Sequence, residues 1–476
     1  MKILVLGGSP KGETSVTMQY VRWIKENLEG HEIETLQVAS RIAALERDEA
    51  AFEAVIEAVR SADAVLWAFP LYVFTVCSQY KRFIELVWER GAEDAFRGKY
   101  AASLSTSIHF FDNTAHEYMR GISEDFGMAF TGSFSPKMDD LGKSECRRQL
   151  LAFAEELVDA AAKKLQLPRR TAALPRRASG AEAPRATEIA AASAPAAAPG
   201  RRALVLVDYP ELAIGAMARR FAAASRAAGE SVQLLGLAEM GMKGGCLGCL
   251  KCGQANHCAY EGKDGFIESY RANLLSADLI VIAGTVKDRL FSARWKAFLD
   301  RSFFNTHQPT LKGKQFLVLA AGPLSLLGNL RETLQGYVEW QGGNLVDMVS
   351  DEVESAAGLD ALIDAAASRT NAALAVGAMK PATFLGVGSM KIFRDDIYSG
   401  LRIVFKADYR AYRKEGVFDF PNRNPLMRLA IWLGYWITSI PPVHKAMFKD
   451  FPKFMIMQYA PIFARAAKGR AERSRA

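Results

Sequence analysis

Residues 2–8 read KILVLGG, a short apolar run that ends in two glycines. Residues 14–30 read TSVTMQYVRWIKENLEG, with apolar side chains at helical spacing and a closing glycine. The first pattern is typical of a buried strand, and the second of an amphipathic helix. This strand–turn–helix unit predicts an α/β fold in which the turn lies at the carboxyl end of a strand.

The same unit recurs through the first 165 residues. Four more strands are predicted, at 32–38, 63–72, 99–108 and 129–136. Helices are predicted between and after them, at 48–62, 78–91, 113–127 and 143–165. Strict alternation with near-continuous apolar strands indicates a parallel sheet that is covered on both faces. Five strands in this length predict a flavodoxin-like doubly wound domain over residues 1–167.

The pattern stops and then starts again. Residues 168–201 are rich in Ala, Pro, Ser and Arg, which is typical of a linker. RALVLVDYP (202–210) then opens a second set of five strands and their helices, which extends to residue 379. The predicted fold class is therefore α/β, with two tandem flavodoxin-like parallel five-stranded sheets. Residues 380–476 are predicted to form a helical C-terminal extension with a basic tail.

Composition limits the classes of function. The 476 residues include 60 basic and 52 acidic side chains, for a net charge of +8. Basic residues cluster at 167–177, 200–202 and 465–476, in segments predicted to be flexible, and no predicted element carries a basic patch interleaved with aromatics. Nucleic acid is therefore not a predicted partner. The N-terminus lacks the order of regions found in a signal peptide, so we expect a cytoplasmic protein.

One segment of the C-terminal extension is strongly apolar. NPLMRLAIWLGYWITSIPPV (424–443) carries a single charge, Arg428. Its apolar core is shorter than the roughly 20 residues needed to span a bilayer. Two interpretations stay open: a helix packed on a domain or a partner subunit, and an interfacial helix that makes peripheral membrane contact.

Three loops of the first domain follow strands, where ligands bind in open α/β folds. The first, GGSPKGETSVT (7–17), combines a glycine turn, a lysine and hydroxyls at a helix start, which suits a phosphate. It is neither a P-loop nor a Gly-x-Gly-x-x-Gly fingerprint, and a well-capped helix is the alternative. The second (69–85) places an aromatic, apolar turn where it can wall a planar ring. The third (104–118) brings hydroxyls and His109.

Together these loops resemble the flavodoxin-like NAD(P)H-dependent FMN reductase and quinone reductase family. The resemblance rests on GGSPKGETSVT (7–17), SADAVLWAFPLYVFTVCSQYKRFIE (61–85) and STSIH (105–109). It implies that FMN accepts a hydride from NAD(P)H and that the flavin, not a side chain, carries the chemistry. It also implies a phosphate site at Ser9, Pro10, Lys11, Ser15 and Thr17. The isoalloxazine ring would be held by Pro70, Leu71, Tyr72, Val73, Ser105, Thr106 and Ser107.

Four of the six cysteines lie in one short stretch, GGCLGCLKCGQANHC (244–258). The spacing Cys-x-x-Cys-x-x-Cys-x5-Cys involves Cys246, Cys249, Cys252 and Cys258. In a reducing compartment, clustered thiols favour a metal or redox role over disulfides. The first three match compact ferredoxin spacing, which indicates an iron–sulfur cluster. A structural zinc site is the main alternative, and redox-active thiols are a third.

At this loop the chain resembles iron–sulfur flavoproteins of the same superfamily. The resemblance extends to GKDGFIESY (262–270) and to residues 276–303, including Lys296 and the pair Asp300–Arg301. It implies a [4Fe-4S] cluster at the four cysteines, next to an FMN. It also implies a homo-oligomer, because superfamily members usually dimerise, or a chain whose two halves take the place of two subunits.

The second domain departs from the pattern where its own FMN would bind. Its first loop, VDYPELAIGAM (207–217), places Asp208 and Glu211 where they would repel a phosphate. TVKDR (285–289) replaces the Pro-x-Tyr turn. We therefore expect the flavin in the first domain and the cluster in the second.

The resulting prediction is an NAD(P)H-dependent FMN oxidoreductase. It would pass electrons through a [4Fe-4S] cluster to a small-molecule or protein acceptor. One alternative is an FMN-dependent quinone or nitro reductase with structural zinc. The other is a non-enzymatic redox-sensing or membrane-docking adaptor.

Overall fold

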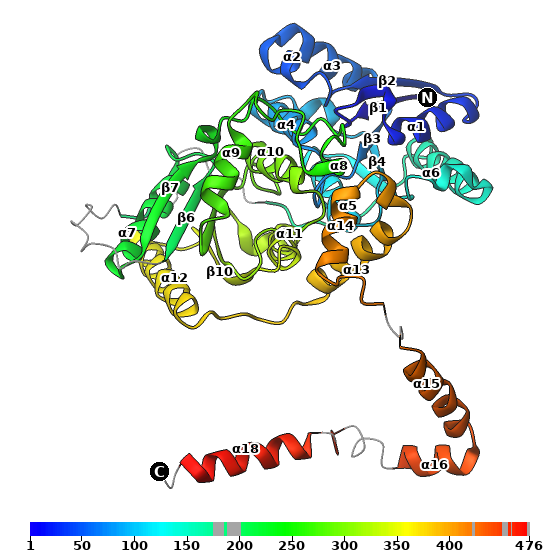
Figure 1. Ribbon diagram of the computed structural model, residues 1–476. Helices are drawn as coiled ribbons and strands as arrows, with labels where there is room; N and C mark the ends of the chain where they lie inside the picture. Colours follow the sequence, from blue (N-terminus) through cyan, green and yellow to red (C-terminus); the bar gives the residue numbers. More distant parts are fainter. Residues whose placement is uncertain (175–184, 188–200, 421–423, 450–455, 458, 474–476) are drawn as a thin grey trace. The chain divides into compact units, whose positions relative to one another are not determined.

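The structure, a computed structural model, describes the chain except for residues 175–184, 188–200, 421–423, 450–455, 458 and 474–476. The chain divides into two compact units, Met1–Tyr412 and Arg413–Ala476. The first unit contains two sheets, and the described part of the second is helical (Figure 1). Most of the linker predicted at 168–201 lies outside the described residues.

The first sheet has five parallel strands in the order β2-β1-β3-β4-β5. Its strands are β1 (Lys2–Gly7), β2 (Glu32–Gln37), β3 (Ala64–Pro70), β4 (Tyr100–Thr106) and β5 (Ala129–Phe134). The central strands are apolar on both faces, because helices cover both. All five lie where the alternation predicts them.

Helices α1 (Val16–Asn27) and α6 (Ser144–Ala162) cover one face of this sheet. On the other face, Trp67 and Phe69 of β3 pack against Tyr80 and His116. The helices of that face are α3 (Glu49–Ser61), α4 (Ser78–Glu89) and α5 (Asp112–Asp125). A further short helix, α2 (Ile42–Arg47), packs on α3 and α4.

The second sheet repeats the first. Its parallel strands have the order β7-β6-β8-β9-β10, the same winding in later residues. They are β6 (Arg202–Val207), β7 (Ser231–Gly236), β8 (Leu279–Thr285), β9 (Gln315–Ala321) and β10 (Asn344–Ser350). One face is covered by α7 (Ala213–Ala227) and α12 (Ala356–Val376), the other by α10 (Ala293–Ser302) and α11 (Gly328–Trp340). The predicted fold class, two tandem flavodoxin-like domains, is confirmed.

Residues after the second sheet form helices in both units. In the first unit, α13 (Phe384–Tyr398) packs on α11, and α14 (Lys406–Lys414) begins beside the second domain. The second unit has α15 (Pro425–Thr438), α16 (Pro441–Lys449) and α18 (Ala460–Arg473). Among the described residues, none of the helices has both the length and the apolar character needed to cross a bilayer.

The two domains meet through α4 and α10, and the contact is reciprocal. The Asp300 carboxylate on α10 accepts a hydrogen bond from the Ser78 amide at the start of α4 (2.7 Å). The Glu85 carboxylate on α4 accepts one from the Ala293 amide at the start of α10 (2.7 Å). Each helix therefore supplies the anion that stabilises the amino terminus of the other. This is the pattern of a two-fold interface, formed here within one chain.

Candidate functional site

The loop between β1 and α1 contains four of the predicted site residues, and a fifth, Thr17, lies in the first turn of α1. Ser15 caps α1 by accepting a hydrogen bond from a helix amide (3.3 Å), and Thr17 shares one with Thr106 of β4 (2.7 Å). Ser9 is 1% exposed, and its hydroxyl accepts from the Lys11 amide (3.2 Å). The Lys11 side chain is exposed. The loop thus presents the Lys11 ammonium beside the amino terminus of α1. The hydroxyls of Ser9, Ser15 and Thr17 are already hydrogen-bonded to other groups of the protein.

The turn after β3 is closed by backbone hydrogen bonds and, among the described residues, leaves two buried hydroxyls unpaired, those of Tyr72 and Thr75. Tyr72 and Thr75 exchange two backbone hydrogen bonds of 2.8 Å. The Tyr72 hydroxyl is buried and has no hydrogen-bond partner among the described residues. Burial raises the pKa of Tyr72 above its ordinary value. This hydroxyl is therefore a protonated donor that the protein itself leaves unsatisfied.

Ser105 and Thr106, predicted in the loop after the fourth strand, are the last two residues of β4 and face opposite sides of the sheet. Ser105 is fully buried and shares a hydrogen bond with His116 Nε2 (2.8 Å), while Ser103 shares one with His116 Nδ1 (2.7 Å). Burial lowers the pKa of His116 to about 4, so the ring is neutral at pH 7. Ser105 therefore hydrogen-bonds to α5 inside the domain, whereas the neighbouring Thr106 bonds to Thr17 of α1 on the other side of the sheet. His109 pairs with Asp112 (2.8 Å).

Arg301 of α10 fixes the cysteine loop. Its buried guanidinium donates two hydrogen bonds to the Asp264 carboxylate (2.8 and 3.0 Å) and one to the Gly244 carbonyl (3.0 Å). The same guanidinium lies over the Tyr260 ring, 4.1 Å from its centroid. A bidentate pair of this kind holds both the start of the loop and the acidic turn that follows it.

The four cysteines of the loop form no disulfide with one another and differ in exposure. Cys249 is exposed, and Cys246, Cys252 and Cys258 are partly buried. The Gly248 amide donates a hydrogen bond to Cys246 Sγ (3.4 Å), and burial raises the pKa of the Cys246 and Cys252 thiols to about 12. Within the described ranges, no three His, Cys, Asp or Glu side chains are grouped as a single metal ion requires.

The flavin loops and the cysteine loop face one cavity of about 310 Å³. Its walls include seven of the twelve predicted FMN residues, namely Lys11, Pro70, Leu71, Tyr72, Val73, Thr106 and Ser107. They also include Cys246, Cys249, Cys252 and Cys258. Five predicted FMN residues are not in the walls: Ser9, Pro10, Ser15, Thr17 and Ser105. The volume is within the usual range for small-molecule sites, about 300–1,000 Å³.

The two domains are in direct contact at this cavity. Gln79 of α4 donates a hydrogen bond to the Cys246 carbonyl (3.0 Å). Gly248 has a φ of +64°, and a Cβ there would lie 1.8 Å from the Tyr72 hydroxyl oxygen. Only glycine allows both this backbone conformation and this approach. The cysteine loop is therefore shaped to the turn of the other domain.

A third wall of the cavity comes from residues that the sequence patterns do not identify. His307 lines the cavity, and its Nδ1 pairs with the Asp408 carboxylate at the start of α14 (2.7 Å). Asp408 is fully buried, and Phe393 and Phe405 pack against the His307 ring, with centroids 4.5 and 4.6 Å away. His307 and Asp408 are 101 residues apart in the chain, so no local motif joins them.

The corresponding strand ends of the second sheet are closed. Asp208 is fully buried, and its carboxylate accepts hydrogen bonds from the Thr285 amide (3.0 Å) and the Ser292 hydroxyl (2.6 Å). Burial raises the pKa of Asp208 to about 6. A Cβ on Gly215 would lie 1.9 Å from the Pro210 carbonyl oxygen, so the loop lies directly on α7. The Asp208 carboxylate therefore occupies the position at which a bound phosphate would need hydrogen-bond donors.

TVKDR (285–289), which replaces the flavin turn in the second domain, binds the first domain. Asp288 accepts hydrogen bonds from Lys81 Nζ (2.9 Å) and the Tyr118 hydroxyl (2.9 Å). Arg289 donates two to the Asp125 carboxylate (2.6 and 2.7 Å). Burial disfavours the Lys81 ammonium, but the adjacent carboxylates outweigh it and raise the pKa of Lys81.

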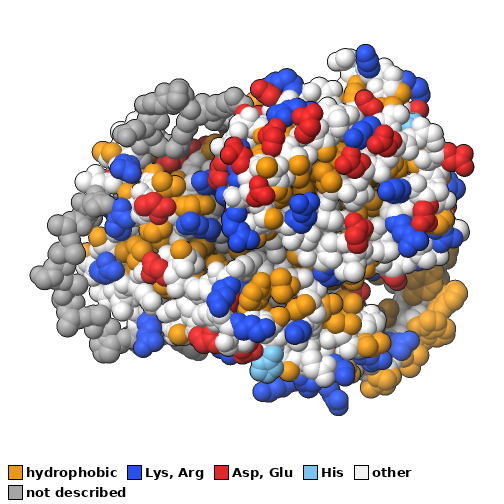
Figure 2. All heavy atoms as spheres, turned by 90° about the horizontal axis from the view of Figure 1, so that it is seen from above, with side chains coloured by type: hydrophobic (Ala, Val, Ile, Leu, Met, Phe, Trp, Pro, Cys, Tyr) orange, Lys and Arg blue, Asp and Glu red, His pale blue; other side chains and the backbone are white. Residues whose placement is uncertain are grey.

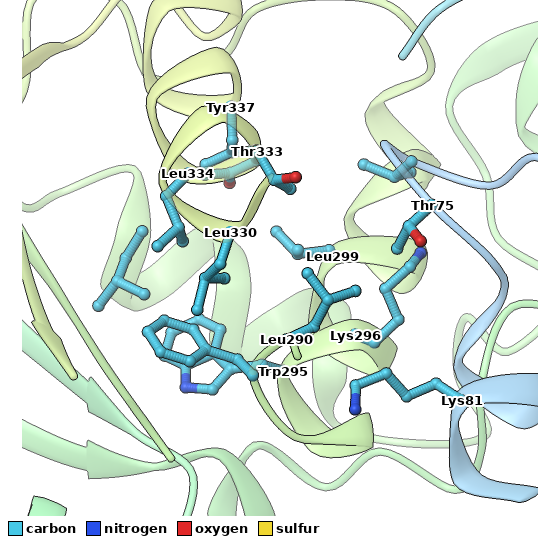
Figure 3. A pocket seen from close by; sticks show the side chains of 13 residues that line it. Thr75, Lys81, Leu290, Trp295, Lys296, Leu299, Leu330, Thr333, Leu334 and Tyr337 are labelled. Atoms are coloured by element: carbon cyan, nitrogen blue, oxygen red, sulfur yellow. The ribbon is translucent and has the colours of Figure 1, made fainter. Parts of the chain in front are cut away.

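Behind this contact lies a smaller cavity of about 40 Å³ (Figure 3). Apolar side chains such as Leu290, Trp295 and Leu334 surround it, and Lys81 and Lys296 lie on one side. Both ammonium groups are already paired, Lys81 with Glu85 and Asp288, and Lys296 with Asp300. The volume of this cavity is far below the roughly 300 Å³ of small-molecule sites, so we assign no ligand to it.

Known proteins resemble parts of this chain. No curated protein matches the chain at a significant level. Among solved structures, an oxidoreductase from Corynebacterium diphtheriae is 17% identical over 34% of this chain and 98% of that chain, with a TM-score of 0.30. A general stress protein 14 from Treponema denticola, in complex with FMN, is 14% identical over 34% and 98%, with a TM-score of 0.26.

An NADPH-quinone reductase from P. pentosaceus is 15% identical over 33% of this chain and 96% of that chain, with a TM-score of 0.26. The family comparison concerns the first domain. Residues 1–134 match the model of the NADPH-dependent FMN reductase family, and this match identifies the N-terminal part of the chain as an oxidoreductase domain.

Proposed function

We propose that this chain is an NAD(P)H-dependent FMN oxidoreductase whose electrons leave through a [4Fe-4S] cluster. The cluster would be held by Cys246, Cys249, Cys252 and Cys258. The observation that carries the proposal is the shared cavity, because the turn of the first domain and all four cysteines of the second face the same space. When bound, FMN supplies hydride acceptance and single-electron release, and an iron–sulfur cluster supplies single-electron transfer.

The residues of the first domain fit FMN. Lys11 and the amino terminus of α1 favour an anion at one end of the cavity. Pro70–Val73 provide an apolar wall, and the unpaired Tyr72 hydroxyl can donate a hydrogen bond to a polar atom of the ring system. Thr106 and Ser107 line the same space. Ser9, Ser15, Thr17 and Ser105 would act indirectly, by fixing the loops.

The four cysteines of the second domain offer thiolate ligands for a cluster. Cys246, Cys249 and Cys252 have the compact ferredoxin spacing, whereas structural zinc sites usually pair two Cys-x-x-Cys units across a longer gap. The grouping of metal ligands among the described residues favours neither site, so the spacing is the support for a cluster. The Gly248 amide beside Cys246 Sγ supplies the kind of hydrogen bond that tunes cluster potentials.

The second domain would take the place of a second subunit. The reciprocal pairing of α4 and α10 gives the contact two-fold character within one chain. Gln79 and Tyr72 of one domain contact the cysteine loop of the other. One chain would then contain the complete site, without a residue from a second subunit. Asp208 closes the second phosphate site, so we expect one FMN per chain.

The test is anaerobic purification of three forms of the full chain: the wild type, Cys249→Ser and Cys146→Ser. Cys146 is a matched control, since it is a buried thiol on α6 that is outside the cavity. We expect about four iron atoms per wild-type chain, together with one FMN. Cys249→Ser should lose iron and keep FMN, whereas Cys146→Ser should keep both.

Spectroscopy then tests the electron path. With NADPH added anaerobically, wild-type protein should lose both flavin absorbance and the broad cluster absorbance. Cys249→Ser should lose the flavin absorbance alone. Zinc in place of iron in the wild type would contradict the cluster and favour the quinone or nitro reductase alternative. Protein without FMN would contradict the oxidoreductase as a whole.

A further inference from the structure

The net charge of the chain is concentrated in one place. Residues 413–476 contain 12 of the 60 basic and 4 of the 52 acidic side chains, which leaves 48 of each in residues 1–412. The second unit therefore carries the entire net charge of +8. On the face shown in Figure 2, acidic and basic side chains are interspersed. The first unit therefore has no net charge, and the second unit is strongly cationic.

The cationic unit also exposes large apolar side chains. Helix α15 (Pro425–Thr438) buries none of its residues. Trp432, Tyr435 and Trp436 are 57%, 65% and 56% exposed. Aliphatic side chains around the same helix are exposed as well: Leu426, Met427, Leu429, Ile431, Leu433 and Ile437. Large apolar side chains exposed together in this number are typical of a site that contacts a partner or a membrane.

The charge and the side-chain types favour a lipid surface as that occupant. Tryptophan and tyrosine are enriched at membrane interfaces, because their rings are apolar and their N–H and O–H groups are polar. Clusters of Lys and Arg are attracted to anionic headgroups. A helix of 14 residues is about 21 Å long and is shorter than the hydrocarbon core of about 30 Å, so α15 would lie in the interface.

A second copy of the chain fits this surface less well. Dimerisation through this unit would bring two bodies with a net charge of +8 together, and like charges repel. A protein partner would need an apolar surface with an acidic rim. An anionic bilayer supplies apolar depth and negative charge together. We infer that residues 413–476 dock the protein on anionic lipid surfaces, with α15 inserted at the level of the headgroups.

The test is flotation of the full chain with lipid vesicles. One set contains phosphatidylcholine alone, and the other contains phosphatidylcholine and phosphatidylglycerol in a two-to-one ratio. We expect binding to the anionic vesicles that weakens as salt is added. The Trp432→Ala/Trp436→Ala variant should bind at least about tenfold more weakly. Leu212→Ala/Leu362→Ala removes two exposed apolar side chains of the first unit and should bind like wild type.

Further variants separate charge from apolar insertion. Lys445→Gln/Lys449→Gln should weaken binding to anionic vesicles, whereas Lys25→Gln in α1 should not. Cys249→Ser should bind as wild type does, so docking is tested apart from the redox function. The inference is wrong if neither vesicle type binds, or if the two tryptophans prove dispensable. A dimer that dissociates in the Trp432→Ala/Trp436→Ala variant, without vesicle binding, would assign the surface to a second copy.

Discussion

The two domains share one winding of five strands and use the same sheet edge differently. After the third strand of the first domain, Pro70–Val73 form a wall of the large cavity. After the equivalent strand of the second, Asp288 and Arg289 bind Lys81 and Asp125 across the domain contact. The fold provides an edge where loops converge, and the loop residues decide whether that edge holds a ligand or a neighbouring domain.

The first loops differ in the same way. In the first domain, Lys11 and the start of α1 present positive charge to the cavity. In the second, Asp208 places a carboxylate inside the strand ends and binds Thr285 and Ser292. One loop stays open to an anion, and the other already contains one. Substitutions at these loops and at the domain contact should therefore have effects of different kinds and sizes.

The largest effect is expected at the domain contact. Asp288→Ala removes the main partner of Lys81, which is 0% exposed, and should reduce the free energy of unfolding by about 3–5 kcal/mol. Urea denaturation measures the change. Glu145→Ala breaks an exposed pair with Arg148, whose side chain is 73% exposed, and should cost less than about 1 kcal/mol. Equal losses in the free energy of unfolding would show that the buried pair contributes no more to stability than the exposed pair.

The second effect is a pH dependence centred on Asp208. Its folded pKa of about 6 lies above the unfolded value of about 3.9, so the folded state retains a proton that the unfolded state releases. Its contribution to stability is therefore full below about pH 4 and is lost as the pH rises through about 6, by about 3 kcal/mol. Asp208→Asn should remove this slope. Denaturation at about pH 4.5 and about pH 7.5 checks it, and parallel pH profiles would contradict the assignment.

The third effect concerns the contact of the cysteine loop with the flavin turn. Gly248→Ala and Gly262→Ala both place a side chain at positive φ, which costs about 1–2 kcal/mol. Only Gly248→Ala also overlaps the Tyr72 hydroxyl, since Gly262 has nothing within 4 Å. Gly248→Ala should therefore cost about 2–3 kcal/mol in total, about 1 kcal/mol more than Gly262→Ala.

A double-mutant cycle identifies the source of that excess. In a Tyr72→Phe background the overlapping hydroxyl is absent, so the excess cost of Gly248→Ala should largely disappear. Thermal denaturation of the four proteins in the cycle provides the data. If Gly248→Ala reduces stability equally in both backgrounds, steric overlap with the Tyr72 hydroxyl is not the source of the excess.

The smallest effect is expected at the phosphate loop. Lys11→Met should weaken FMN binding about tenfold, or about 1.4 kcal/mol, through loss of a charge-assisted contact. Titration of apoprotein by flavin fluorescence measures the affinity. Lys25→Met, in the last turn of the same helix, should leave it unchanged. An unaltered affinity in Lys11→Met would move the phosphate site away from this loop.

Local patterns predict the strands well because parallel strands buried on both faces are continuous apolar runs. They predict the direction of single side chains less well. Ser105 stands in a motif that points to flavin, yet Ser103 and Ser105 share one face of β4, and His116 of α5 covers that face. The period-two alternation of a strand contains this information. The pairing of His307 with Asp408 has no comparable signal, because 101 residues separate them.

The sequence by itself determined the α/β class, the repetition of the domain, and the grouping of four thiols in one loop. These features depend on residues close together in the chain, where periodicity and spacing act directly. Only the tertiary structure decided that the cysteine loop of the second domain lies against Tyr72 and Gln79 of the first. That contact depends on how α4 packs on α10, with Asp300 and Glu85 each bound at the start of the other helix. Packing between elements so far apart in the chain arises from complementary surfaces that no local pattern encodes.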